Sequence, residues 1–244
     1  MNAKPRFEPL GDQGLLATFG EAHDGEAVAT AAAFSRSVMA KPLPGLRDCV
    51  PAYASLAVYY DPATVIAGSR MGKREKQQVS AYTLCQEYMT ASWQGFHSKS
   101  QPRGKLIVIQ AYYGGAAGAD LSAVARSLGL SEDEVIQIHA KQEYTVQAIG
   151  FAPGFPYMSG LDPRLTLPRK DTPNTRVEAG SIGVAGQHTG IYPVELPGGW
   201  HIIGRTMQVL FDPDQYPPAM LEPGDRVRFE PMSADREQSK EVSP

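Results

Sequence analysis

The sequence contains very little cysteine: Cys49 and Cys85 are the only two among 244 residues. A small secreted protein that relied on disulfides would carry more of them. We therefore expect free, buried thiols in a reducing compartment. A disulfide between Cys49 and Cys85 is the alternative that the sequence leaves open.

Long apolar runs and an excess of charge are also missing. The N-terminus, MNAKPRFEPL, lacks the apolar core of a signal peptide, and no run approaches the roughly 20 apolar residues of a membrane-spanning helix. The formal net charge is -3 and the sequence pI is about 6.0, so there is no basic excess for nucleic acid or an anionic membrane. These absences predict a cytoplasmic protein with no nucleic-acid partner and no membrane partner.

Familiar nucleotide and metal motifs are absent as well. The segment GSRMGKR at 68–74 has three residues between its glycines where a phosphate loop has four, and Arg where Ser or Thr would bind Mg²⁺. The five histidines form no HxxxH, no HxH and no pair with CxxC, so we predict no metal site. Ser181, in AGSIG, is one glycine short of a nucleophile elbow, which favours a turn-fixing hydrogen bond over catalysis.

The first part of the chain predicts a small α+β domain over residues 1–94. Its apolar patterns give strands at 6–10, 14–19, 48–53 and 55–60, helices at 24–41 and 72–93, and a short helical turn opened by Asp61-Pro62. Asp24 is the expected N-cap of the first helix. A polar stretch with Gly and Pro at 95–104 is the expected linker.

The second part, 105–232, predicts a domain of many short strands, typical of a barrel or a sandwich. The expected strands are 105–113, 144–149, 200–203, 208–211 and 226–229, and the expected helices are 120–128 and 131–141. Asp120 should cap the first of these helices, and SEDE at 131–134 should form a capping box at the second. The polar stretch 233–244 is predicted to be a flexible tail.

The segment Gly150–Thr206 is the most informative part of the sequence, because 17 of its 57 residues are Gly or Pro. Such a stretch predicts short strands joined by rigid loops, where binding residues tend to lie. A turn-rich β domain without a site remains the alternative. Arg164, Arg169 and Arg205 could bind an anionic substrate, since guanidinium groups pair with carboxylates and phosphates, or could form surface salt bridges. Trp200 could be a stacking wall or a core residue.

This segment resembles the family of the 5-oxoprolinase B subunit, also called allophanate hydrolase subunit 1, which includes the kinase inhibitor KipI. The matching motifs are GFAPGFPYM at 150–158, LDPRL at 161–165, AGSIGVAG at 179–186, TGIYP at 189–193 and PGGWHIIGRT at 197–206. Weaker matches extend over nearly the whole chain and are weakest over about 65–104.

The resemblance implies a small α+β N-terminal domain followed by a cyclophilin-like β-barrel domain. It also implies hydrolysis of 5-oxo-L-proline to L-glutamate coupled to ATP hydrolysis, with ATP bound on a partner subunit or between subunits. The implied partners are an allophanate hydrolase subunit 2-type protein, which is the C subunit of 5-oxoprolinase, and the A subunit of 5-oxoprolinase. The alternatives are an inhibitor of a sensor histidine kinase, and a carboxyltransferase subunit of the allophanate hydrolase or urea carboxylase type.

On this resemblance we expect a site for a phosphorylated, anionic transition state. Arg169, Arg205 and His139 are the catalytic candidates, although the place of His139 in the last turn of a helix also fits a structural role. The substrate-binding candidates are Phe155, Tyr157, Ser181, Gln187, Tyr192 and Trp200. The chain departs from the family pattern at Ala116, Asn174, Glu178 and Leu196, which raises the question of whether it keeps the family's substrate.

Overall fold

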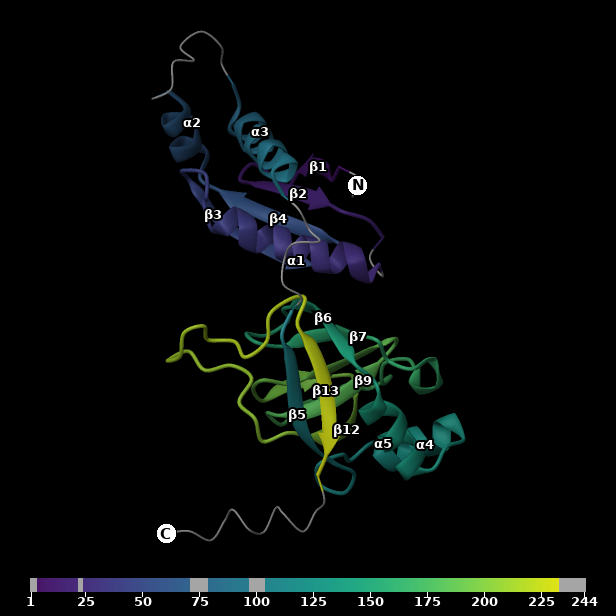
Figure 1. Cartoon of the computed structure of the whole chain (residues 1–244). Helices are drawn as coiled ribbons and strands as arrows, with labels where there is room; N and C mark the ends of the chain where they lie inside the picture. The colour runs from purple at the N-terminus through teal and green to yellow at the C-terminus, as the bar shows by residue number, and fades with distance from the viewer. Residues whose placement is uncertain (1–3, 22–23, 71–78, 97–103, 233–244) are drawn as a thin grey trace. The chain divides into compact units, whose positions relative to one another are not determined.

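The computed structural model describes residues 4–21, 24–70, 79–96 and 104–232, and the chain forms two compact units, Met1–Arg103 and Gly104–Pro244 (Figure 1). The predicted tail at 233–244 and most of the GSRMGKR segment lie outside the described residues. Within those ranges, no helix combines the length and the apolar character needed to traverse a bilayer.

The first unit is a four-stranded antiparallel sheet with helices packed on one face. In chain order its elements are β1 (Arg6–Pro9), β2 (Gly14–Thr18), α1 (Gly25–Met39), β3 (Leu46–Ala52), β4 (Ser55–Tyr60), α2 (Pro62–Arg70) and α3 (Ala81–Gln94), and the strand order is β1-β2-β4-β3. Leu15 of β2 and Val58 of β4 are fully buried with Phe34 of α1 and Met89 of α3. Because one side of the alternating strands meets both helices, the two helices share a face of the sheet.

The start of α1 follows the sequence, whereas the helix predicted over 72–93 begins only at Ala81, after the N-cap Ser80; residues 71–78 lie outside the described part. Asp24 accepts a 2.9 Å hydrogen bond from the Glu26 amide, as its predicted N-cap role requires. The turn after Asp61 is longer than predicted and forms the nine-residue helix α2. Cys49 and Cys85 are free and buried, and burial raises the pKa of each thiol to about 12, so both stay protonated at neutral pH.

The second unit is a closed seven-stranded barrel with two helices beside it. Its elements are β5 (Leu106–Tyr113), α4 (Leu121–Leu128), α5 (Glu132–Lys141), β6 (Tyr144–Ile149), β7 (Pro156–Ser159), a 3₁₀ turn (Pro163–Leu165), β8 (Asn174–Val177), β9 (Ser181–Ala185), β10 (His188–Ile191), β11 (Leu196–Gly198), β12 (His201–Arg205) and β13 (Arg226–Pro231). The barrel order is β10-β7-β6-β13-β5-β12-β9, and β8 pairs with β11 as a separate small sheet. The predicted fold class, an α+β unit followed by a β-barrel, is confirmed.

Two local predictions in this unit were wrong. Residues 208–211 form no strand; instead the side chain of Gln208 bonds to the backbone of β5, at Gln110 N–H and Val108 C=O. Asp120 precedes α4 as predicted, but its carboxylate makes no capping bond and is used elsewhere. The capping box of Ser131 and Glu134 is confirmed.

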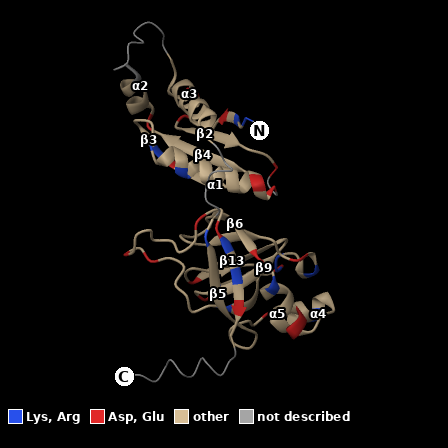
Figure 2. Cartoon of the chain, in the orientation of Figure 1, with Lys and Arg blue, Asp and Glu red and all other residues tan. Residues whose placement is uncertain are grey.

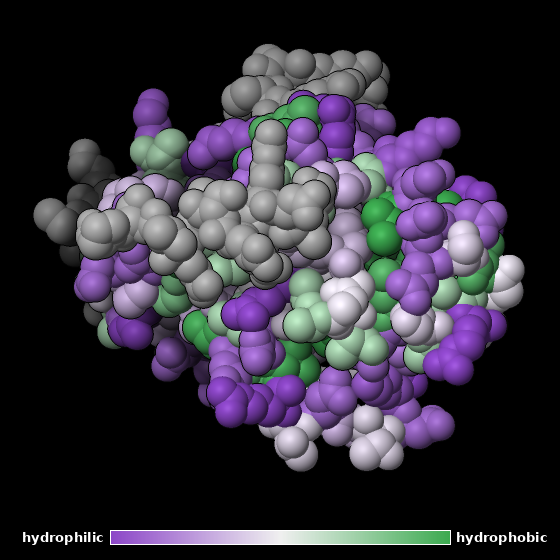
Figure 3. All heavy atoms as spheres, turned by 90° about the horizontal axis from the view of Figure 1, so that it is seen from below, coloured by the Kyte–Doolittle hydropathy of each residue, from purple (hydrophilic) through white to green (hydrophobic). Residues whose placement is uncertain are grey.

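The surface mixes charges and apolar groups rather than separating them. Figure 2 shows basic and acidic residues interspersed along the described ribbon, with Arg226 and Arg228 on β13. The face seen in Figure 3 carries small apolar patches between hydrophilic side chains. Large exposed apolar side chains include Phe151, Met207 and Val209.

Candidate functional site

An aromatic cluster covers the outer face of the barrel wall formed by β9, β10 and β12. Residues on these strands alternate between two sides: Ile182 and Ile203 belong to the barrel core, whereas Ala185 and Ile202 belong to the cluster. The other members come from the Gly- and Pro-rich segment: Ala152, Phe155, Val177, Tyr192 and Trp200, with Tyr157 and Leu196 packed against them. The structure therefore brings four of the predicted substrate-binding residues together.

Phe155 is the centre of this cluster. Its ring centroid lies 4.9 Å from that of Tyr157, 5.2 Å from that of Tyr192 and 5.5 Å from that of Trp200, in edge-to-face arrangements that favour aromatic pairs. Trp200 is only 6% exposed, which favours the core alternative over a stacking wall.

Phe151 is a rim residue that the sequence did not reveal. Its ring is 62% exposed and packs edge-on against Phe155 and Tyr192. Its φ of 69° lies in the left-handed region, which a bulky residue rarely adopts. No sequence pattern marks this conformation. It places the exposed ring of Phe151 at the solvent-facing edge of the cluster.

The cluster needs glycine at Gly190 on β10, because a Cβ there would lie 2.8 Å from Phe155 Cζ and 2.9 Å from the Pro156 carbonyl oxygen. We expect Gly190→Ala to lower the free energy of unfolding by about 1–3 kcal/mol, since an overpacked site must shift ring or backbone. Gly150→Ala is the matched control, because a Cβ at Gly150 meets nothing within 4 Å. Urea unfolding monitored by the fluorescence of Trp200, in a Trp93→Phe background, measures both. Equal midpoints for the two variants would contradict the expectation.

The four arginines of the Gly- and Pro-rich segment, Gly150–Thr206, differ in their partners. Arg164 pairs with Asp162 at 2.8 Å, Arg176 pairs with Glu195 at 2.7 Å, and Arg205 pairs with Glu178. Among the residues that the structure describes, no carboxylate lies within ion-pair distance of the exposed Arg169. Arg169 is thus the arginine of this group whose guanidinium can meet an external anion without first leaving a carboxylate.

The charge of Arg169 acts on the phenol of Tyr192. Burial raises the pKa of Tyr192, while a hydrogen bond with the Trp200 backbone and the positive charge of Arg169 oppose that rise. The phenol therefore stays protonated at neutral pH, but Tyr192 is only 1% exposed, so its hydroxyl lies inside the aromatic cluster. The exposed guanidinium of Arg169, which has no carboxylate partner among the described residues, suits an anionic group such as a carboxylate or a phosphoryl oxygen.

The guanidinium of Arg205 is bound by neighbouring groups of the same chain. Its Nε donates to the Ala179 carbonyl at 3.0 Å and its Nη1 meets the carboxylate of Glu178. Glu178 is one of the departures from the family pattern, so this departure neutralises one of the predicted catalytic arginines. In this arrangement Arg205 anchors the chain before β9 rather than facing an open site.

His139 lies in the core, where it has no exposed surface. Thr189 Oγ1 donates to the Gly183 carbonyl, so it accepts from His139 Nε2 at 3.0 Å, which leaves Nδ1 to accept from the Tyr113 hydroxyl at 2.8 Å. Burial lowers the pKa of His139 to about 3. A neutral, fully bonded histidine without a path to solvent supports the structural alternative, and we no longer count His139 among the catalytic candidates.

Ser181 and Gln187 lie at the two ends of β9. Ser181 is buried, and its backbone bonds to the Glu178 carbonyl and the Tyr192 amide. Gln187 is exposed on the turn between β9 and β10, and the preceding Gly186 amide donates to the Leu167 carbonyl at 2.7 Å. Ser181 therefore fixes the backbone beside Tyr192, whereas Gln187 stands on a turn tied to the segment that leads into Arg169.

A partly buried ion pair lies beside Arg169, and the sequence did not reveal it. Lys170 Nζ is 2.8 Å from Asp120 Oδ1 and 3.2 Å from Asn174 Oδ1. Asn174 is another departure from the family pattern, and here it accepts a bond from Lys170. Leu196, a third departure, packs against the aromatic cluster, while Ala116 is exposed between β5 and α4.

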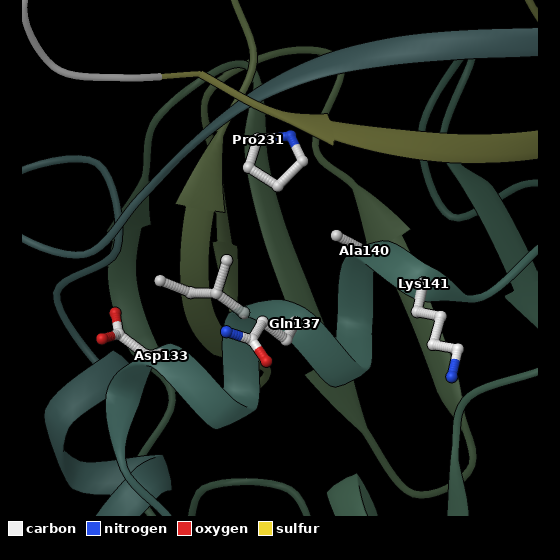
Figure 4. A pocket seen from close by; sticks show the side chains of 6 residues that line it. Asp133, Gln137, Ala140, Lys141 and Pro231 are labelled. Atoms are coloured by element: carbon white, nitrogen blue, oxygen red, sulfur yellow. The ribbon is translucent and has the colours of Figure 1, made fainter.

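A separate shallow pocket of about 560 Å³ lies along α5 (Figure 4). It is lined by Asp133, Ile136, Gln137, Ala140, Lys141 and Pro231. None of the predicted site residues lines it, so it has no part in the site considered above.

Residues 5–221 match the model of the carboxyltransferase domain, subdomain C and D. The chain is 35% identical over 237 residues to the B subunit of 5-oxoprolinase from Bacillus subtilis (strain 168), covering 94% of this chain and 93% of that protein. It is 48% identical over 132 residues to the B subunit of 5-oxoprolinase from Escherichia coli O157:H7, covering 54% of this chain and 61% of that protein. The crystal structure of TTHA0988 resembles it with a TM-score of 0.75 and 37% identity, over 91% of this chain and 40% of that chain.

Proposed function

Because the chain belongs to the family of the carboxyltransferase domain, subdomain C and D, we propose that it is the B subunit of an ATP-dependent 5-oxoprolinase complex that hydrolyses 5-oxo-L-proline to L-glutamate. The observation that carries the proposal is its similarity to the B subunit of Bacillus subtilis over 93% of that protein's length. The partners we propose are the A and C subunits of 5-oxoprolinase.

The arrangement around Arg169 fits the chemistry of this reaction. A lactam is resonance-stabilised and resists water, and ATP supplies the phosphoryl group that makes its carbonyl carbon electrophilic and so allows water to open the ring. Negative charge then develops on phosphoryl oxygens, and fixed cationic and hydrogen-bond donors stabilise it. Arg169 is the donor of this chain that we assign to that charge, and the buried Tyr192 packs in the aromatic cluster within reach of the charge of Arg169.

The chain's own residues fit an anionic phosphoryl group better than a whole nucleotide. Arg169 is an exposed cation without a carboxylate partner in the described part of the chain. No nucleotide-binding motif is present in the sequence. We therefore propose that a partner subunit makes most contacts to ATP, whereas this chain contributes at the transferred group.

Reconstitution tests the proposal. We expect no glutamate from 5-oxoproline with the chain alone, and ATP-dependent glutamate release once the A and C subunits of 5-oxoprolinase are added. Glutamate is measured by an amino-acid assay and ADP in parallel, since coupled hydrolysis must produce both. A well-formed three-protein complex that releases no glutamate would overturn the proposal, and binding to a histidine kinase dimerisation domain or carboxyl transfer from a biotinylated partner would then be measured.

A further inference from the structure

Both neighbours of Arg169 in the chain are held by other elements of the barrel unit. The Pro168 carbonyl accepts a 2.9 Å hydrogen bond from His201 Nε2, at the start of β12. The Lys170 amide donates to the Gly199 carbonyl at 2.8 Å. The backbone at Arg169 is therefore tied on each side to the segment that leads into β12.

The side chain of Lys170 adds a third tie, through Asp120. Asp120 is fixed to β12 twice, because its Oδ2 accepts from the Ile202 amide at 2.8 Å and its own amide donates to the Ile202 carbonyl at 2.9 Å. Its remaining oxygen holds Lys170 Nζ at 2.8 Å. The two side chains are only 22% and 18% exposed, whereas the Arg176–Glu195 pair is 71% and 50% exposed. The sheltered pair is screened less by solvent and salt.

This use of Asp120 explains why it does not cap α4. A cap would direct the carboxylate to the amides of the first helical turn, but both of its oxygens are committed to Lys170 and Ile202. The carboxylate of Asp120 therefore stabilises the loop that carries Arg169 and not the first turn of α4.

We propose that Asp120, Lys170 and His201 form a brace that holds Arg169 in place for an anionic ligand. They are positioning residues: they act on the ligand through Arg169 and do not contact it. The role assigned to Arg169 in transition-state binding rests on the proposed function, whereas the brace itself is a property of this chain alone. A fixed backbone at Arg169 limits where the guanidinium can reach, so less freedom is lost on binding, and a displaced backbone would weaken the reaction out of proportion to the distance moved.

The first test reads Arg169 directly in the full-length isolated chain. We expect the backbone ¹⁵N–¹H group of Arg169, which lies between the two tied residues, to show restricted motion in heteronuclear relaxation. Lys170→Met and Asp120→Asn should each make it mobile, and the double variant should add little, because both remove the same tie. Lys170→Arg, which keeps the charge, should restore order. Glu195→Gln, which breaks the exposed Arg176 pair, is the matched control and should change nothing. An Arg169 that is equally mobile in the wild type and in Lys170→Met would overturn the brace.

The second test uses the assembled complex. At equal folded fractions, Lys170→Met should lower kcat about tenfold to a hundredfold with little change in KM for 5-oxoproline, and Lys170→Arg should recover most of the loss. Undiminished kcat in Lys170→Met would also overturn the proposal. If the wild-type complex shows no ATP-dependent turnover, the proposed function fails, and the relaxation measurement alone decides the brace.

Discussion

Arg169→Ala is expected to lower kcat/KM of the reconstituted complex for 5-oxoproline by about 10²–10³-fold, the usual consequence of removing one preorganised donor to developing negative charge. The guanidinium is exposed and without a carboxylate partner in the described part of the chain. The loss should fall mainly on kcat, because the charge is greatest in the transition state. Steady-state glutamate release, with co-purification of the partner subunits to confirm assembly, measures the effect.

Arg164→Ala is the matched control for this experiment. Arg164 is exposed on the same segment and carries the same charge, but its guanidinium is held by Asp162. We expect Arg164→Ala to change kcat/KM less than threefold, since an exposed ion pair contributes little. Equal losses in the two variants would show a general effect of surface charge and would remove Arg169 from the site.

Local features of this chain could be read from the sequence. Asp24 caps α1, and Ser131 with Glu134 caps α5, because a capping side chain binds amides within the next three residues. The division into short strands within the Gly- and Pro-rich segment followed from the backbone limits of those residues. These predictions depend on neighbours in the sequence. The order of the elements gave an α+β unit followed by a barrel or a sandwich, and the family resemblance indicated the barrel.

Features set by distant partners could not be read in the same way. Asp120 occupies a capping position, but its carboxylate is taken by Lys170 and by Ile202, which lie 50 and 82 residues away. The apolar pattern at 208–211 predicted a strand, yet Gln208 bonds to β5 through its side chain. The four arginines of the Gly- and Pro-rich segment look alike in sequence. The fold places Asp162, Glu178 and Glu195 against the other three, and this leaves Arg169 without a carboxylate partner among the described residues.

The environment of His139 is also set by distant elements, and its burial leads to a large expected effect of pH on stability. Its position near the end of α5 suggested a cation stabilised by the helix dipole, whereas the fold encloses it as a neutral ring. Tyr113 of β5, Tyr144 of β6 and Phe229 of β13 surround it, and Thr189 of β10 accepts its Nε2 proton. Burial raises the pKa of both tyrosines, so neither titrates below neutral pH.

The second unit should therefore lose stability in mild acid because of His139. The folded-state pKa is lowered to about 3 from the ordinary 6.5. The unfolded chain thus takes up a proton, as pH falls below about 6.5, that the folded state cannot accept. Stability contributed by this group is present above the unfolded pKa and is lost as pH falls toward the folded one. Linkage gives a loss of about 3 kcal/mol between pH 7 and pH 4.

The measurement compares the wild-type His139 and His139→Gln in a Trp93→Phe background. The chain has two tryptophans, so Trp200 then reports on the unfolding of the barrel unit. Carboxylates such as Asp162, whose pKa is lowered to about 2 by hydrogen bonds from Arg164, also weaken the fold in acid but do so in both proteins. The difference between the two urea-derived stability curves isolates the histidine, because glutamine can hydrogen-bond but does not titrate in this range. We expect the curves to converge by about 3 kcal/mol from pH 7 to pH 4, and parallel curves would mean that His139 is not held neutral in the core.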